Sequence, residues 1–213
     1  MKYSASALVL GFFAALSAAA PAPQSTVIDP KSVYIEGIDY AGTGCKAGSA
    51  SISHADDYQT FTISFDSYLA SIGPGIAFPE SRKNCNLNVK LHYPPGYQYT
   101  LYKTDYTGFA NLQKGVTANQ QSQYWFAGFN QKATLKSTFY GPYQNDYTFT
   151  DLLANEAWVW SPCGASTTLN INTALLLTSS DPKASGYIST DVIDTSVKTK
   201  QRYTYGMNWR KCT

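Results

Sequence analysis

The chain has 213 residues and a formal net charge of +2, and 44% of its residues are hydrophobic while only 14% are charged. This length is ample for one domain with a hydrophobic core. A charge balance so close to neutral lacks the basic stripe of a duplex-binding protein, so we expect no nucleic-acid partner.

The N-terminus carries the three parts of a secretory signal peptide in order. Lys2 supplies the positive charge, residues 7–16 form an apolar run, and small residues follow at 17–20. We place the cleavage after Ala19, because cleavage one residue later would put Pro21 next to the scissile bond. An apolar run of about ten residues spans only ~15 Å as a helix, half of a bilayer core, so no membrane anchor is expected. The mature protein is therefore predicted to be secreted, to the extracellular space or the cell wall.

The predicted domain organisation is simple. Residues 20–31 contain Pro21, Pro23 and Pro30 and almost no side chains suited to a core, so they are predicted to form a disordered leader. No repeat and no second linker follows. Residues 32–213 are predicted to form a single β-sandwich domain.

Alternation of apolar and polar residues dominates the rest of the chain and predicts β-strands. The predicted inward rows are, in chain order, Phe61, Ile63, Phe65 and Leu69; Leu87, Val89, Leu91 and Tyr93; Leu169, Ile171 and Leu175; and Tyr203, Tyr205, Met207 and Trp209. Turn-forming stretches such as Gly73-Pro74-Gly75 and Pro94-Pro95-Gly96 separate these rows. About ten strands and no amphipathic helix of three turns predict an all-β fold, a two-sheet antiparallel sandwich of the jelly-roll-like or Greek-key type.

All four cysteines, Cys45, Cys85, Cys163 and Cys212, lie in the exported part of the chain. An even number of cysteines in an oxidising compartment predicts two disulfides, with three possible pairings. We favour Cys45–Cys85 with Cys163–Cys212, which puts one bridge in each half of the chain. No two cysteines have the short spacing that a zinc ribbon needs, and we expect no metal.

Six short stretches share their order with the motifs of a known family. They are Gly42-Thr43-Gly44-Cys45, Ser81-Arg82-Lys83-Asn84-Cys85, Leu91-His92-Tyr93-Pro94-Pro95-Gly96, Trp160-Ser161-Pro162-Cys163-Gly164, Leu169-Asn170-Ile171-Asn172-Thr173 and Trp209-Arg210-Lys211-Cys212. From about Val33 to the C-terminus the chain resembles the secreted domain-of-unknown-function family 4360. The resemblance implies a small exported protein with four cysteines, typically fungal. It implies no activity, and an effector-like role toward a host or the surrounding wall rests on analogy alone.

The segment Glu156-Ala157-Trp158-Val159-Trp160 is the first candidate for a binding site. In a strand whose Ala157 and Val159 face the core, Glu156, Trp158 and Trp160 share the exposed face. Indoles stack on the apolar faces of sugar rings, and a carboxylate accepts hydroxyl hydrogen bonds. The tendency of large aromatic side chains to bury their area favours the alternative, in which both indoles belong to the core.

Two further features are consistent with binding. The chain has 17 tyrosines, and amphipathic rings of this kind suit sugar-like or protein surfaces as well as ordinary sheet surfaces. Eight of them crowd its middle third: Tyr97, Tyr99, Tyr102, Tyr106, Tyr124, Tyr140, Tyr143 and Tyr147. Arg82 and Lys83 lie in a predicted loop over residues 76–84, beside Cys85. A cationic loop held by a disulfide suits a carboxylate-bearing ligand or partner. The simpler interpretation is that its charges keep a turn soluble.

Glycoside hydrolysis requires two facing carboxylates. The candidates within or beside predicted strands are Glu36, Asp66, Glu80 and Glu156, and each is more simply a solvated strand residue. His54 and His92 are the only histidines, and no Gly-x-Ser-x-Gly turn accompanies them. The sequence therefore contains no complete catalytic constellation.

These features favour a secreted, non-enzymatic binding or effector-like protein that recognises cell-wall carbohydrate or a host surface protein. We expect it to act as a monomer, without cofactor or metal. One alternative is a polysaccharide-acting hydrolase that uses a carboxylate pair. The other is a secreted structural or inhibitor protein.

Overall fold

The computed structural model describes residues 32–164, 166–189 and 201–212. The predicted signal peptide (1–19) and leader (20–31) lie outside these residues. The strands are β1 (Tyr34–Ala41), β2 (Ala50–His54), β3 (Thr60–Phe65), β4 (Ala70–Ile72), β5 (Arg82–His92), β6 (Tyr97–Leu112), β7 (Val116–Phe126), β8 (Ala133–Tyr140), β9 (Tyr143–Leu152), β10 (Thr167–Ser179), β11 (Gly186–Ser189) and β12 (Gln201–Lys211). Two 3₁₀ turns, η2 (Phe78–Ser81) and η3 (Asn155–Ala157), interrupt the connections.

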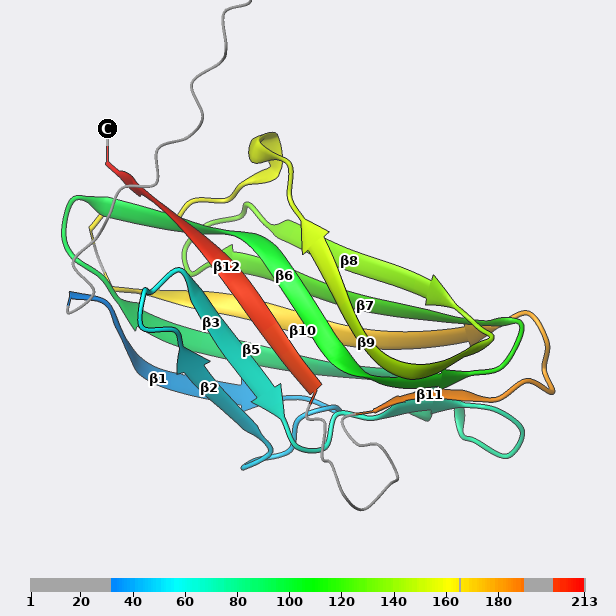
Figure 1. Cartoon of the computed structure of the whole chain (residues 1–213). Coiled ribbons are helices and arrows are strands. Elements are labelled where there is room, and N and C mark those ends of the chain that lie inside the picture. The colour runs from blue at the N-terminus through cyan, green and yellow to red at the C-terminus, as the bar shows by residue number, and fades with distance from the viewer. Residues whose placement is uncertain (1–31, 165, 190–200, 213) are drawn as a thin grey trace, which may run out of the picture.

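The strands form two antiparallel sheets that pack face to face (Figure 1). Sheet A has the order β1-β5-β10-β7-β8, and sheet B has the order β2-β3-β12-β6-β11-β4, with β9 paired to β6. The predicted two-sheet antiparallel sandwich is confirmed. The chain crosses between the sheets several times, so strands that are neighbours in a sheet are often far apart in the sequence.

Period-two alternation builds the core as predicted, with one exception. The inward rows of β5, β10 and β12 are buried, and so are Phe61, Ile63 and Phe65 of β3. Leu69, predicted to continue the β3 row, is 46% exposed, and Tyr68 is fully buried instead. Because β3 ends at Phe65, the chain bends before Tyr68 and the alternation does not carry over.

Many tyrosines lie in the core, including Tyr99, Tyr106, Tyr124 and Tyr147 from the tyrosine-rich middle of the chain. The buried tyrosines are Tyr68, Tyr93, Tyr99, Tyr106, Tyr124, Tyr147, Tyr203 and Tyr205. Buried hydroxyls need partners, and sheet A supplies several of them. The Tyr68 hydroxyl lies 3.0 Å from the Thr173 carbonyl oxygen, and the Tyr205 hydroxyl lies 2.8 Å from Ser122 Oγ. The tyrosine-rich composition therefore reflects, in large part, a polar-lined interior.

Both predicted disulfides are confirmed. Cys45–Cys85 ties the segment after β1 to β5, and Cys163–Cys212 ties the segment before β10 to the residue after β12. In the chain-entropy interpretation, loops of this length contribute roughly 4 kcal/mol each through the unfolded state. The bridges lie at opposite ends of the sandwich, because Cys85 is near the start of β5 and Cys212 follows the end of β12.

Candidate functional site

The outer face of sheet A carries a group of Asn and Gln side chains. On β5, β7 and β10 the inward residues are buried, and each strand has Asn or Gln at two or three consecutive outward positions. We call this surface the amide face; it comprises Asn84, Asn86, Asn88, Asn119, Gln121, Gln123, Asn170 and Asn172. All of these side chains are exposed or half-buried.

Strand register brings the amides into rows that cross the sheet. Asn88 pairs with Asn170, which pairs in turn with Trp125. The next row joins Asn86, Asn172 and Gln123 in the same way. Directly paired residues have Cβ atoms only about 4.5–5.5 Å apart, so each row presents adjoining polar groups from three strands.

Some amides are held in place by neighbours and others are not. Asn172 donates a hydrogen bond to Asn86, and Gln123 Nε2 donates to Thr134 Oγ1 at 3.2 Å. Among the described residues, the Asn88 and Asn170 side chains make no hydrogen bond. Each primary amide offers both donors and an acceptor. The first row therefore has free hydrogen-bonding capacity beside an indole.

Trp125 stands at the end of the first row with a cation next to it. The side chain is half-buried, and Lys132 Nζ lies 4.7 Å from the centroid of its ring. Lys132 is in the exposed loop between β7 and β8 and forms no ion pair among the described residues. A long lysine side chain on a loop is free to move aside or to pair with an anion beside the ring.

The segment around Trp158 and Trp160 is not a strand, contrary to the conformation assumed for it. Glu156 lies in the η3 turn and is exposed, and Ala157 is exposed as well. Val159 is buried, whereas both indoles are half-buried. The indoles are therefore neither an open row nor a core layer.

Contacts within the protein occupy much of these two indoles. They pack edge-on against each other at 5.8 Å, and Trp158 Nε1 donates to the Leu153 carbonyl at 3.1 Å. The Arg210 guanidinium covers one face of Trp160 at 3.9 Å. Backbone hydrogen bonds, such as Ser161 N–H to the Tyr99 carbonyl at 2.8 Å, hold the segment against the edge of β6. This aromatic cluster covers a strand edge and leaves only part of its area exposed.

Arg82 lies far from the aromatic cluster. It is the first residue of β5, which is 11 residues long, so the two ends of the strand are about 35 Å apart. The predicted loop over residues 76–84 therefore ends at Ser81. Arg82 is exposed and pairs in register with Leu176, at the border of the amide face.

The four candidate carboxylates are spread over the molecule. Glu80, in η2, forms an ion pair with Lys83 at 2.8 Å, and Asp66 directly follows β3 at the same end of the sandwich. At the other end, Glu36 lies on the edge strand β1 and Glu156 follows β9, beside the opposite edge of the sandwich. Glu80 and Glu36 thus lie at opposite ends of the sandwich, each beside a basic side chain, whereas a glycosidase needs two carboxylates that face each other.

Glu36, His92 and Ser166 form a cluster that the sequence did not reveal. Glu36 Oε1 lies 3.5 Å from His92 Nδ1, and Ser166 Oγ lies 3.4 Å from the same nitrogen. A nucleophilic triad needs the serine at one imidazole nitrogen and the carboxylate at the other. Because both partners meet Nδ1, this exposed cluster lacks the geometry of a triad.

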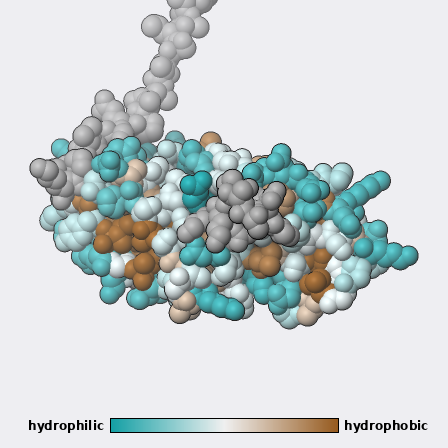
Figure 2. All heavy atoms as spheres, turned by 60° about the horizontal axis from the view of Figure 1, so that its bottom comes forward, coloured by the Kyte–Doolittle hydropathy of each residue, from teal (hydrophilic) through white to brown (hydrophobic). Residues whose placement is uncertain are grey.

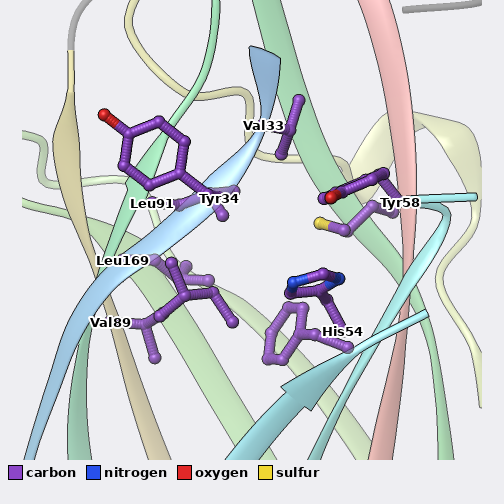
Figure 3. A pocket seen from close by; sticks show the side chains of 10 residues that line it. Val33, Tyr34, His54, Tyr58, Val89, Leu91 and Leu169 are labelled. Atoms are coloured by element: carbon purple, nitrogen blue, oxygen red, sulfur yellow. The ribbon is translucent and has the colours of Figure 1, made fainter. Parts of the chain in front are cut away.

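A narrow apolar pocket opens between β1 and the β2–β3 hairpin (Figure 3). His54 and Tyr58 form one wall, with their rings stacked at 4.7 Å. Val33, Val89, Leu91 and Leu169 are among the residues that line the rest. These walls offer few polar atoms to a sugar or a metal, and the described residues contain no group of three or more His, Cys, Asp or Glu suited to an ion.

Exposed apolar side chains are scattered. The most exposed are Phe78 in η2 (85%), Tyr140 in β8 (67%) and Leu152 in β9 (63%). Figure 2 shows hydrophobic atoms on one face as separate spots among hydrophilic ones. No helix in the described part of the chain has the length and apolarity to cross a bilayer.

Comparison with known proteins agrees with the motifs. The sequence model of the family described as Domain of unknown function (DUF4360) matches residues 31–212. The chain belongs to this family. An uncharacterized secreted protein of Arthroderma benhamiae is 43% identical to this DUF4360 protein over 185 residues, which cover 87% of the chain and 74% of the relative. With two disulfides and this relative, the DUF4360 chain is a secreted, extracellular protein.

Among solved structures, the carbohydrate-binding module TmCBM61 in complex with β-1,4-galactotriose aligns with 83% of this DUF4360 chain and 90% of its own. The TM-score is 0.29 and the identity 9%, so the alignment supports no inference about fold or ligand.

The sequence analysis did not predict the amide face, because it considered each strand separately. The signal was present, since Asn or Gln recurs at alternate positions in Asn84–Asn88, Asn119–Gln123 and Asn170–Asn172. Only the strand order β5-β10-β7 makes one surface of these three stretches.

Proposed function

We propose that this secreted protein binds polysaccharide on the amide face. The observation that supports the proposal is the row Asn88, Asn170 and Trp125, which aligns two amides without side-chain partners and an indole on neighbouring strands. Neighbouring hydroxyls of a sugar ring are donors and acceptors at once, as primary amides are. An indole packs its apolar face against the C–H groups of the ring.

The preformed surface favours binding. The Asn86 and Asn172 side chains already bond to each other, so part of the entropic cost of ordering them is met in the free protein. A sheet face also suits an extended polymer, because a chain lying across it contacts several rows at once.

Retention on insoluble polysaccharides tests the proposal. Trp125→Ala and the double change Asn88→Ala with Asn170→Ala should each weaken retention about tenfold, as loss of a central contact of more than 1 kcal/mol does. The control is Thr62→Ala with Thr204→Ala, two hydroxyls that bond to each other on the outer face of sheet B. Undiminished retention by a folded Trp125→Ala protein, or no retention of wild type on any polymer, would reject the proposal.

The aromatic cluster is a second candidate surface for the same function. Trp158 and Trp160 are half-buried, and Tyr102 packs 6.2 Å from Trp158. Glu156 is exposed next to them. Trp158→Ala and Trp160→Ala belong in the same assay, and loss of retention in these variants alone would move the site from the amide face to this cluster.

A further inference from the structure

Apart from the edge strand β1, charge on the outer face of sheet A is one-sided. The strands β5, β7, β8 and β10 contain no Asp or Glu. Their outward positions carry Arg82, Lys90 and Lys136, and Lys132 of the adjoining loop lies over Trp125. The whole chain has 16 Lys and Arg against 14 Asp and Glu, so four cations on and beside strands without an acidic residue are a local excess of positive charge.

The cations surround the amides. Arg82 and Lys90 are near the two ends of β5, and Lys136 lies on the edge strand β8, in register with Gln121. Strand spacing puts β8 about 14 Å from β5, and eight residues along β5 span about 27 Å. A polymer lying across the amides therefore passes within reach of several cations.

These cations are not engaged elsewhere. The ion pairs of the described residues join Lys83 with Glu80, His92 with Glu36, and Lys103 with Asp105. Two carboxylates lie on the neighbouring edge strand β1, and one of them, Glu36, is the partner of His92. The remaining one, Asp39, pairs in register with Asn88 at the border of the amide face.

We propose that the ligand of the amide face is an acidic polysaccharide whose sugar rings carry carboxylates. This inference rests on the proposed function and specifies its ligand. The amides bind ring hydroxyls, while Lys90, Lys132, Lys136 and Arg82 pair with carboxylates along the chain. Lys132 is suited to the ring that stacks on Trp125, because its ammonium group already lies 4.7 Å from the indole centroid. A nucleic acid fits less well, since one half-buried indole provides little base stacking and four dispersed cations provide few phosphate contacts.

Polygalacturonate and its fully methyl-esterified form make the decisive pair of probes, because they share one backbone and differ in charge. We expect the charged form to bind about five- to tenfold more tightly at low ionic strength. The preference should vanish at about 0.5 M salt, where screening acts within ~4 Å. The double change Lys90→Gln with Lys136→Gln should remove most of the preference. The control removes two charges elsewhere: Lys114→Gln with Lys183→Gln, both exposed in connections outside the face.

Each outcome decides between the two proposals. Equal binding of both polymers, weakened by Trp125→Ala, would overturn the acidic ligand and leave polysaccharide binding intact. No binding to these or to neutral glucan and xylan would remove both proposals. Equal affinity for single-stranded DNA would also overturn the inference, because the face would then be a general polyanion surface. A salt-sensitive preference that depends on Lys90 and Lys136 would support it.

Discussion

The guanidinium carbon of Arg210 lies 3.9 Å from the ring centroid of Trp160, and its Nε donates a hydrogen bond to Gln98 Oε1 at 3.1 Å. Gln98 in turn donates to the Ser161 carbonyl at 2.8 Å. These contacts connect β12 and β6 to the segment that covers the edge of β6. The Trp160 indole, predicted to bind a ligand, thus helps to cover the edge of β6.

Removing the Arg210 side chain should therefore cost stability. Arg210→Ala should lower the free energy of unfolding by about 1–2 kcal/mol, since it removes a cation–π contact and a charge-assisted hydrogen bond. Urea unfolding followed by tryptophan fluorescence measures the change. Arg202→Ala, on an exposed position of the same strand, should stay within about 0.5 kcal/mol of wild type. Equal losses in both variants would contradict the role assigned to Arg210.

The Tyr99 hydroxyl is buried and has no hydrogen-bond partner among the described residues. Because burying an unpaired hydroxyl is unfavourable, Tyr99→Phe should raise the free energy of unfolding by about 1 kcal/mol. Tyr205→Phe should lower it by about 1 kcal/mol, since it leaves the buried Ser122 hydroxyl without this partner. The same urea series measures both, and a loss of stability in Tyr99→Phe would show that its hydroxyl is satisfied.

Alkaline pH should unfold the protein cooperatively. Burial raises the pKa of Tyr68, Tyr99, Tyr203 and Tyr205 well above the usual value of 10.0. The unfolded chain releases these protons near pH 10 and the folded protein does not, so stability is complete below about pH 10 and falls above it. Tyrosinate absorbance of these buried rings should rise in the same step in which near-ultraviolet circular dichroism is lost. If all tyrosines lost their protons near pH 10 while the protein stayed folded, the prediction would be contradicted.

Gly44 has no room for a side chain. A Cβ there would lie 2.0 Å from Cε2 of the fully buried Tyr68, whose hydroxyl is anchored on Thr173. Gly44→Ala should therefore lower the free energy of unfolding by about 3 kcal/mol through overpacking. Gly37→Ala is the matched control, because nothing lies within 4 Å of its Cβ position. Differential scanning calorimetry of the two variants decides the point, and similar melting temperatures would refute it.

Most of the fold class was predictable because its signals are local. Residues two apart in an extended chain point to the same side, so runs such as Leu87–Tyr93 identify an inward row without knowledge of any partner. The same reasoning failed at Leu69, where a bend between Phe65 and Tyr68 resets the alternation. It also failed at Glu156–Trp160, where alternating residues lie in a turn and a covered edge segment.

The sequence by itself determined that this is a secreted β-protein with two disulfides and an amphipathic strand pattern, because composition, cysteine count and period-two alternation need no long-range information. Only the tertiary structure decided which strands are neighbours. Asn88, Asn170 and Trp125 lie on one row because β10 inserts between β5 and β7, an order that depends on how the two sheets bury their inward rows against each other. Local alternation shows that each of these residues points outward. It contains no information about which of them meet.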